Sequence, residues 1–208
     1  MKRKLAIYLA GSIKKAHEKA DESYWTDADM LTLSELLSGF EISFLNPAFR
    51  TDDLSDQLSV FGRDMLQVFS SHVVFVDARD RRGLGVGAEM MWAKVNRIPV
   101  VTWAPKNTHY NKEQTTILEK TVTNYVHPFV ESLSDKIVEN LDEGAAWIDF
   151  MLSTPSIQIK DLDHVIQAMQ HYKENQFAQD QPMQALLMSS KELKQRAERT
   201  PPILSSLV

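Results

Sequence analysis

Up to about residue 150, short apolar runs alternate with longer segments in which apolar residues recur at helical spacing. The runs end at a glycine, an Asn-Pro pair or a charged residue, which is typical of buried strands in a parallel sheet. They predict strands over residues 4–10, 41–45, 73–77 and 98–103. A short fifth strand is predicted over residues 121–129, where His127-Pro128 favours an edge position.

Between these runs, apolar residues three and four positions apart predict helices over residues 13–38, 57–71, 86–96 and 132–152. Residues 106–115 are polar and are expected to form a loop. Strands and helices therefore alternate with short connections, which is typical of an α/β fold. We predict a doubly wound, mostly parallel five-stranded sheet with flanking helices, plus a C-terminal helical extension.

The pattern changes after Ser153-Thr-Pro155. Two amphipathic helices are predicted over residues 161–174 and 183–199, separated by a Gln-rich link and accompanied by no strand. We therefore divide the chain into an α/β domain over residues 1–153 and a helical extension over residues 154–208. The extension is expected to pack on the core or on another subunit rather than to carry catalysis.

Composition excludes several classes of protein. The net charge is −5 and no basic stripe is present, so we expect no polymeric nucleic acid as a partner. Without cysteine there is no disulfide framework, thiolate nucleophile or Cys-based zinc site, and we expect a cytoplasmic protein. The basic start and the apolar residues 5–10 are similar to a signal peptide, but the run is short and is better explained as a buried strand. No run approaches the ~20 apolar residues that span a bilayer, so no membrane partner is expected.

The richest candidate chemistry follows the buried strand that ends at Asp77. A charged loop leads to Gly83, Gly85 and Gly87, and these open a predicted helix whose first turn contains Glu89. Glycines let the backbone approach a ligand closely, and a helix N-terminus favours negative charge. We therefore expect Glu89 to be ionised and to face a substrate, outside the C-terminal end of a strand, where α/β proteins bind ligands.

Two further segments extend this set. The first strand ends in Tyr8-Leu-Ala-Gly-Ser-Ile13, and Asp64 lies in the helix before the third strand. In this order, with Gly83-Leu-Gly-Val-Gly-Ala-Glu89, they resemble the nucleoside 2-deoxyribosyltransferase family, including its 2'-deoxynucleoside 5'-monophosphate N-hydrolase branch. The resemblance covers about residues 5–130. It implies cleavage of an N-glycosidic bond, and a homodimer or larger homo-oligomer whose active sites borrow residues from a neighbour.

The reaction suits these residue types. Cleavage develops oxocarbenium character at C1' and negative charge on the leaving base, so one carboxylate attacks or stabilises the sugar and an acid protonates the base. The resemblance implies that Glu89 is the nucleophile and that Asp64 positions the sugar hydroxyls and the nucleophile. It also places Tyr8 close to the nucleophile. Asn124 looks like the asparagine that transferases contribute across a subunit interface.

The acid has two candidates. Some family members carry an aspartate immediately before the glycines, where this chain has Arg81-Arg82. Asp77, at the strand end, and Asp80, in the loop, are the available substitutes. The sequence alone does not decide which of the two is the acid.

The branch of the family also stays open. Gly11, Ser12 and Ile13, followed by Lys14-Lys15, resemble the turn with which the hydrolase branch holds a 5'-phosphate. However, a glycine precedes Leu84 where that branch has a serine. We expect deoxyribosyl transfer from 2'-deoxynucleosides, with hydrolysis of 2'-deoxynucleoside 5'-monophosphates as the alternative. A sensor that binds a nucleotide derivative without turnover is the non-enzymatic alternative.

Other motifs point to no cofactor. His164 and His171 share a predicted helix face but lie two turns apart, which does not favour a metal site. The glycines lack the Gly-x-Gly-x-x-Gly register of dinucleotide sites, and no P-loop lysine follows them. We expect neither a metal nor a cofactor, and a nucleoside or nucleotide as the small-molecule partner.

Overall fold

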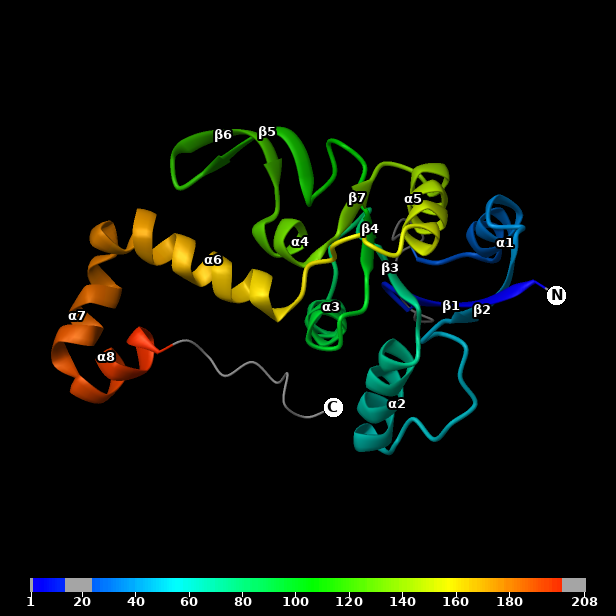
Figure 1. Cartoon of the computed structure of the whole chain (residues 1–208), viewed down its shortest axis with the longest axis horizontal. Coiled ribbons are helices and arrows are strands. Elements are labelled where there is room, and N and C mark those ends of the chain that lie inside the picture. The colour runs from blue at the N-terminus through cyan, green and yellow to red at the C-terminus, as the bar shows by residue number, and fades with distance from the viewer. Residues whose placement is uncertain (1, 14–23, 200–208) are drawn as a thin grey trace. The chain divides into compact units, whose positions relative to one another are not determined.

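A computed structural model describes residues 2–13 and 24–199 of the chain. Its main sheet has five strands, all parallel, in the order β2-β1-β3-β4-β7. The strands are β1 (Arg3–Ala10), β2 (Phe40–Leu45), β3 (Val73–Asp77), β4 (Val100–Trp103) and β7 (Lys136–Val138). The predicted doubly wound α/β fold is confirmed (Figure 1).

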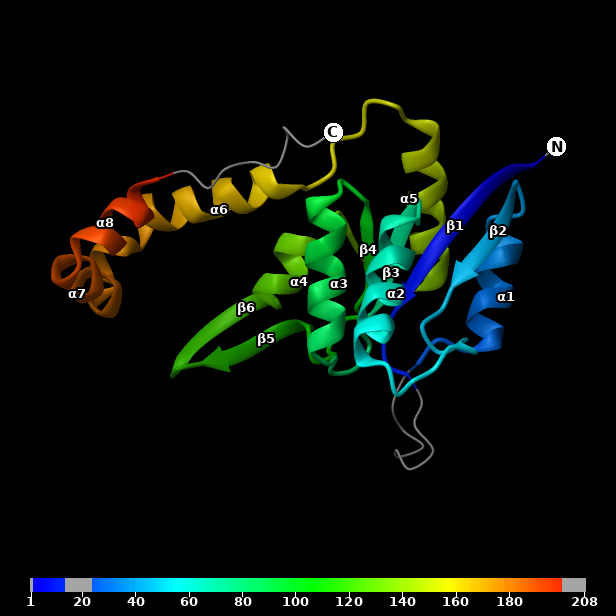
Figure 2. The ribbon, with the colours of Figure 1, turned by 90° about the horizontal axis from the view of Figure 1, so that it is seen from below.

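Helices cover both faces of this sheet (Figures 1 and 2). One face carries α1 (Asp27–Leu36) and α5 (Leu141–Ser153), and the other carries α2 (Gln57–Phe69), α3 (Leu84–Val95) and α4 (Pro128–Leu133). Since side chains alternate along a strand, Ile7 and Leu9 of β1 pack in the cluster with α1 and α5, whereas Tyr8 packs in the cluster with α2 and α3. The alternation therefore directs Tyr8 towards the helix that carries Glu89.

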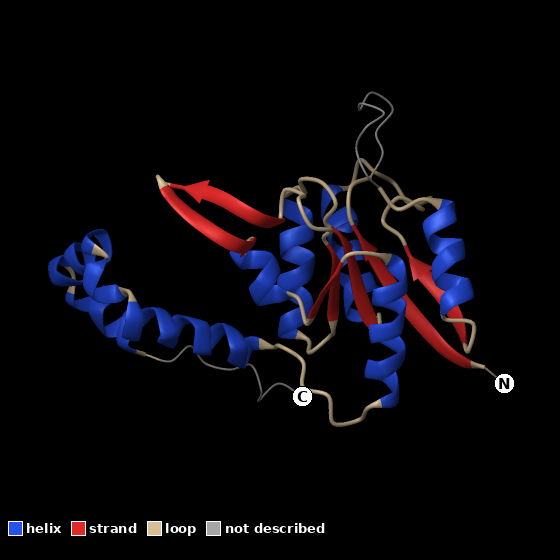
Figure 3. Ribbon diagram, turned by 90° about the horizontal axis from the view of Figure 1, so that it is seen from above, coloured by secondary structure: helices blue, strands red, loops and turns tan. Residues whose placement is uncertain are grey.

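The region after β4 differs from the prediction. Residues 121–129 do not join the main sheet. Instead, β6 (Lys120–Val126) pairs antiparallel with β5 (Asn111–Ile117), which begins inside the segment 106–115 that was predicted as loop. Figures 1 and 3 show this hairpin standing clear of the main sheet. The hairpin is mostly exposed, so its side chains lack the apolar run by which a buried strand is recognised.

The helix predicted over residues 132–152 is also interrupted. It is replaced by the end of α4, the short fifth strand β7 and α5. The Asp135 carboxylate accepts hydrogen bonds from the Val100 and Lys160 N–H groups and pairs with the buried Lys94 ammonium. These contacts with distant residues keep the segment around Asp135 from continuing as a helix. The spacing of apolar residues along the chain does not reveal them. The Asn140 side chain then caps α5 by accepting from the Glu143 N–H group.

The N-terminal helix begins later than predicted. Thr26 and Asp29 form a capping box in which each side chain accepts from the other's backbone N–H group, so α1 starts at Asp27. The earlier part of the predicted helix, residues 14–23, lies outside the described residues.

The chain divides into two compact units, Met1–Lys160 and Asp161–Val208. The division falls seven residues beyond the predicted boundary at 153/154, because Ile157 packs against the core and the Lys160 backbone bonds to Asp135. The second unit contains α6 (Leu162–Asn175), the short helix η1 (Phe177–Gln179), α7 (Gln181–Ser189) and α8 (Lys191–Glu198). The Ser190 side chain caps α8, which divides the helix predicted over residues 183–199. Within the described ranges, no helix combines the length and apolar character needed to cross a membrane.

Candidate active site

A pocket of about 490 Å³ lies outside the C-terminal ends of β1, β2 and β3. The strand order reverses between β1 and β3, and such a switch point is where open α/β sheets bind ligands. The pocket is lined by the turn after β1, by α2 and by the segment that opens α3: Gly11, Ser12, Ile13, Pro47, Asp64, Arg81, Gly83, Gly85, Val86 and Glu89. The structure therefore brings together most of the residues that the sequence singled out. Pro47 was missed, although it follows a predicted strand and belongs to the same edge.

Glu89 is the buried carboxyl of this pocket, with 7% of its surface exposed. Its Oε1 accepts a hydrogen bond of 2.9 Å from the Tyr8 hydroxyl. Its Oε2 is buried and has no hydrogen-bond partner among the described residues. The Tyr8 hydroxyl thus fixes one oxygen of Glu89, and the other oxygen has no such contact among the described residues.

The ionisation of Glu89 departs from the expectation. The helix α3 starts at Leu84 with Gly83 as its N-cap, two residues earlier than predicted, so Glu89 lies in the second turn. The helix dipole acts mainly within the first turn, and burial outweighs it. Burial and the nearby negative charge of Asp64 raise the pKa of Glu89 to about 7, and the hydrogen bond from Tyr8 opposes this rise.

Tyr8 lies behind Glu89 rather than in the pocket lining. Its side chain is fully buried on β1, and burial together with the Glu89 carboxylate raises the pKa of its hydroxyl well above the usual range. Tyr8 therefore remains protonated and acts as a fixed hydrogen-bond donor to Glu89.

Asp64 is the second carboxyl of the pocket. It lies on α2 and is partly buried, with Arg63 Nη1 at 3.2 Å and Arg50 Nη1 at 3.8 Å from its Oδ1. Burial raises the pKa of Asp64 and outweighs the lowering effect of the two guanidinium groups. The two arginines were missed by the sequence analysis; only the adjacency of Arg63 to Asp64 was visible in the chain.

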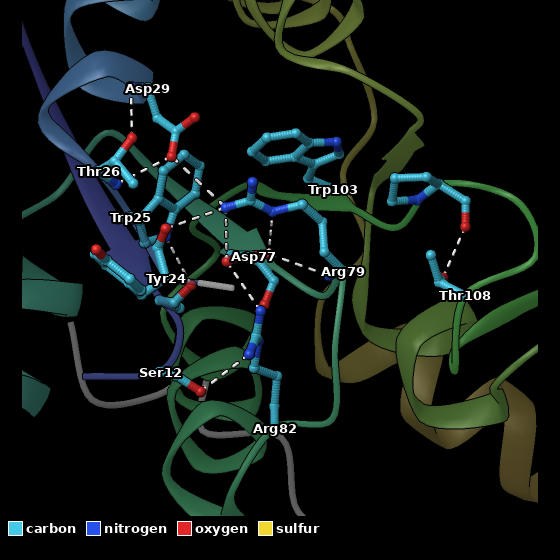
Figure 4. A network of polar contacts seen from close by, with 12 residues as sticks. Ser12, Tyr24, Trp25, Thr26, Asp29, Asp77, Arg79, Arg82, Trp103 and Thr108 are labelled. Atoms are coloured by element: carbon cyan, nitrogen blue, oxygen red, sulfur yellow. Dashed lines mark hydrogen bonds and ion pairs between the residues drawn. The ribbon is translucent and has the colours of Figure 1, made fainter. Parts of the chain in front are cut away.

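Asp77 lies outside the pocket lining. It is fully buried between two arginines (Figure 4): Arg79 Nε is 2.9 Å from its Oδ1, and Arg82 Nη2 is 2.9 Å from its Oδ2. The Arg79 guanidinium also stacks 3.7 Å above the Trp103 ring. This arrangement suits a side chain that anchors the loop after β3. Asp80, the other candidate acid, is partly buried in that loop and does not line the pocket either.

The three glycines leave space above the start of α3. None has a positive φ, and a Cβ built on Gly83 or Gly87 meets no atom within 4 Å. A Cβ on Gly85 comes no closer than 3.9 Å to Glu89 Oε1. Neither backbone conformation nor internal packing requires glycine here, although glycine inside a helix costs about 1 kcal/mol relative to alanine. The bare backbone leaves room for a molecule to approach this segment from outside.

Basic groups border the pocket. Arg82 Nη1 donates to Ser12 Oγ over 2.9 Å, which ties the turn after β1 to the glycine segment. Arg81 is exposed and lines the pocket, with its Nε 3.4 Å from His109 Nδ1. Lys14 and Lys15 lie outside the described residues.

Asn124 does not line this pocket. It is exposed on β6 with a φ of 51°. In the ranges that the structure describes, no group of three or more His, Cys, Asp or Glu side chains is placed to hold a metal ion.

No model of a known protein family matches this chain, and no curated protein matches its sequence. Its function is therefore inferred from the geometry of the pocket and from the motifs that it brings together.

Proposed function

We propose that this chain cleaves the N-glycosidic bond of 2'-deoxynucleosides through Glu89 and transfers the deoxyribosyl group to an acceptor base. This is the activity that resemblance to the nucleoside 2-deoxyribosyltransferase family implies. The observation that carries the proposal is the Glu89 carboxyl, with one oxygen held by Tyr8 and the other buried, unpartnered among the described residues, at a pocket that contains a second carboxyl. We place the enzyme in the cytoplasm, as a homo-oligomer.

In this mechanism the ionised Glu89 attacks C1' as the bond from C1' to the base nitrogen breaks. The electron pair of that bond moves to the base, which takes up a proton. The glycosyl ester on Glu89 is then attacked at C1' by an acceptor base, which returns its N–H proton to the group that protonated the leaving base, and Glu89 leaves as a carboxylate. The hydrogen bond from Tyr8 favours the ionised form in both steps, because an O–H donor stabilises a carboxylate.

Asp64 is the carboxyl best placed to supply the proton. Of the four candidate carboxyls, only Asp64 and Glu89 line the pocket. Asp77 is held between two arginines, and Asp80 lies in the loop outside the lining. The raised pKa of Asp64 keeps a proton on this carboxyl to a higher pH than on an exposed aspartate. This assignment adds an acid role to the positioning role that the resemblance implies for Asp64.

Hydrolysis of 2'-deoxynucleoside 5'-monophosphates is the second candidate. Arg81 and the Ser12 hydroxyl both border the pocket, and a guanidinium and a hydroxyl suit a phosphate. In that reaction, water replaces the acceptor base and releases deoxyribose 5-phosphate.

The decisive experiment is incubation of the purified chain with 2'-deoxynucleosides and their 5'-monophosphates, each with and without a second free base. Exchange of bases indicates the transferase, and release of base from monophosphates without exchange indicates the hydrolase. Stoichiometric nucleotide binding with no base released from any substrate would contradict both proposals and favour a sensor.

Tyr8→Phe is expected to shift the pH dependence of this activity. Removing the hydroxyl removes the interaction that lowers the pKa of Glu89, so the pKa should rise above its present value of about 7. Because the nucleophile must be ionised, the acid limb of kcat/KM should move to higher pH, with about tenfold lower activity near neutrality. Tyr172→Phe, in the C-terminal unit, is the control and should leave the profile unchanged. An unmoved limb in Tyr8→Phe would show that Tyr8 does not tune Glu89.

A further inference from the structure

A second hollow, of about 230 Å³, lies between the start of α3, α4 and the base of the β5–β6 hairpin. We call it the α3–α4 hollow. Its surface is mostly apolar, with Val76, Met90, Phe129 and Leu133 joined by the rings of Tyr110 and His127. It is separate from the pocket around Glu89, and the mechanism above makes no use of it.

The hollow and the active-site pocket share part of a wall. Gly83 and Val86 line both. Since a Cβ on Gly83 would meet nothing within 4 Å, the two spaces are divided there by backbone that carries no side chain. A ligand in one space therefore lies against the same short segment as a ligand in the other.

Two polar groups stand among the apolar walls. His127 Nδ1 is buried and forms no hydrogen bond within the part of the chain that the structure describes. The Tyr110 hydroxyl accepts from the Arg82 backbone N–H group over 2.8 Å and keeps its own proton to donate. The Tyr110 and His127 rings meet edge to face, with centroids 5.4 Å apart. Apolar and aromatic walls with a few polar atoms are typical of sites for planar heterocycles.

We propose that the α3–α4 hollow binds a flat heteroaromatic ring the size of a nucleobase. The choice of a nucleobase, rather than another heterocycle, rests on the proposed function. A cavity of roughly 150 Å³ lined by apolar side chains takes up benzene, so the volume here suits one or two fused rings. A ring nitrogen or N–H group of the ligand would pair with His127 Nδ1, whose burial without a partner is unfavourable. The ring belongs either to the bound substrate or to a free base.

Arg82 connects the hollow to the active site. Its backbone N–H group bonds to Tyr110 in the hollow, and its guanidinium pairs with Asp77 and donates to Ser12 in the pocket. Displacement of Tyr110 by a ring would thus move a residue that also supports the pocket. We expect ring binding and substrate binding to be coupled through this residue.

The test is methyl NMR of the full chain labelled at its methionines, titrated with free adenine and free thymine. Met90 lines the hollow, so its signal should shift on saturation, whereas that of Met151, on α5 at the opposite face of the sheet, should not. Gly87 lines only the hollow and Gly85 only the pocket, and a Cβ on either clashes with nothing. Gly87→Leu should therefore weaken the base binding that the Met90 signal reports about tenfold or more, and Gly85→Leu should leave the binding at the hollow intact.

An unmoved Met90 signal, or binding that Gly85→Leu abolishes and Gly87→Leu spares, would overturn the proposal. The readout needs no turnover, so base binding in a chain that cleaves no substrate would contradict the proposed function alone.

Inhibition kinetics separates the two sources of the ring. Competition between free base and substrate, relieved by Gly87→Leu, indicates that the substrate's own base occupies the hollow. A change in kcat without competition indicates a free base acting as an effector, and both results support the ring site.

Discussion

Glu89→Gln is expected to abolish N-glycosidic cleavage and, at the same time, to stabilise the fold above neutral pH. Activity should fall by about 10³-fold or more, since glutamine cannot form the glycosyl ester. The amide keeps an oxygen to accept from Tyr8, so the packing should survive. The protein would then lose its proposed chemistry and gain stability in one substitution.

The gain in stability has a defined pH window. The pKa of Glu89 rises from 4.5 in the unfolded chain to about 7 in the folded one. Between these values the unfolded chain gives up its proton and the folded chain keeps it, so stability falls as pH rises and stays low above the window. Glutamine removes this loss. Urea unfolding at about pH 8 should therefore show a gain of about 3 kcal/mol that fades as the pH approaches 4.5.

Glu113→Gln is the matched control, because Glu113 is exposed on the hairpin. It should change neither activity nor the slope of stability against pH. Full activity in Glu89→Gln would refute the proposed nucleophile. Equal stability of Glu89→Gln and the natural chain at all pH values would show that Glu89 is not buried as a carboxyl of raised pKa.

Asp77→Asn is expected to destabilise the fold by about 3 kcal/mol, because it removes the carboxylate that pairs with the buried Arg82 guanidinium. The Arg82 side chain is only 4% exposed, so water cannot replace the lost carboxylate. The free energy of unfolding from urea titration measures this effect. Glu139→Gln removes one partner of the exposed ion pair with Lys106 and should cost less than about 1 kcal/mol.

The same variant decides whether Asp77 is the proton donor. A purine that already carries a positive charge through N7-methylation leaves without a proton, so it rescues a variant that lacks the acid. If Asp77 only anchors the loop, Asp77→Asn should lose a similar fraction of activity on ordinary and methylated purine substrates. Selective rescue by the methylated substrate would identify Asp77 as the proton donor. The parallel experiment on Asp64→Asn should show that rescue.

Much of the site was accessible from local patterns. Buried strands end where polar residues begin, and the parallel order places these ends at one edge of the sheet, so Ser12 and Glu89 were expected near each other. The pocket lining contains both. The hairpin and the fifth strand were mispredicted because exposed strands lack a strong apolar pattern, and because Asp135 interrupts a helical one through distant partners.

By itself, the sequence determined the layered α/β core and the glycine segment that leads to Glu89, because the spacing of apolar residues and glycines is a local property of the chain. Only the tertiary structure decided which carboxyls share a pocket and how their pKa values are shifted. Tyr8 and Glu89 are 81 positions apart, and their hydrogen bond exists only once β1 and α3 pack together. The same packing buries most of the Glu89 side chain and places two arginines against Asp77. Burial and charge pairing set these properties, and both arise from contacts between distant segments.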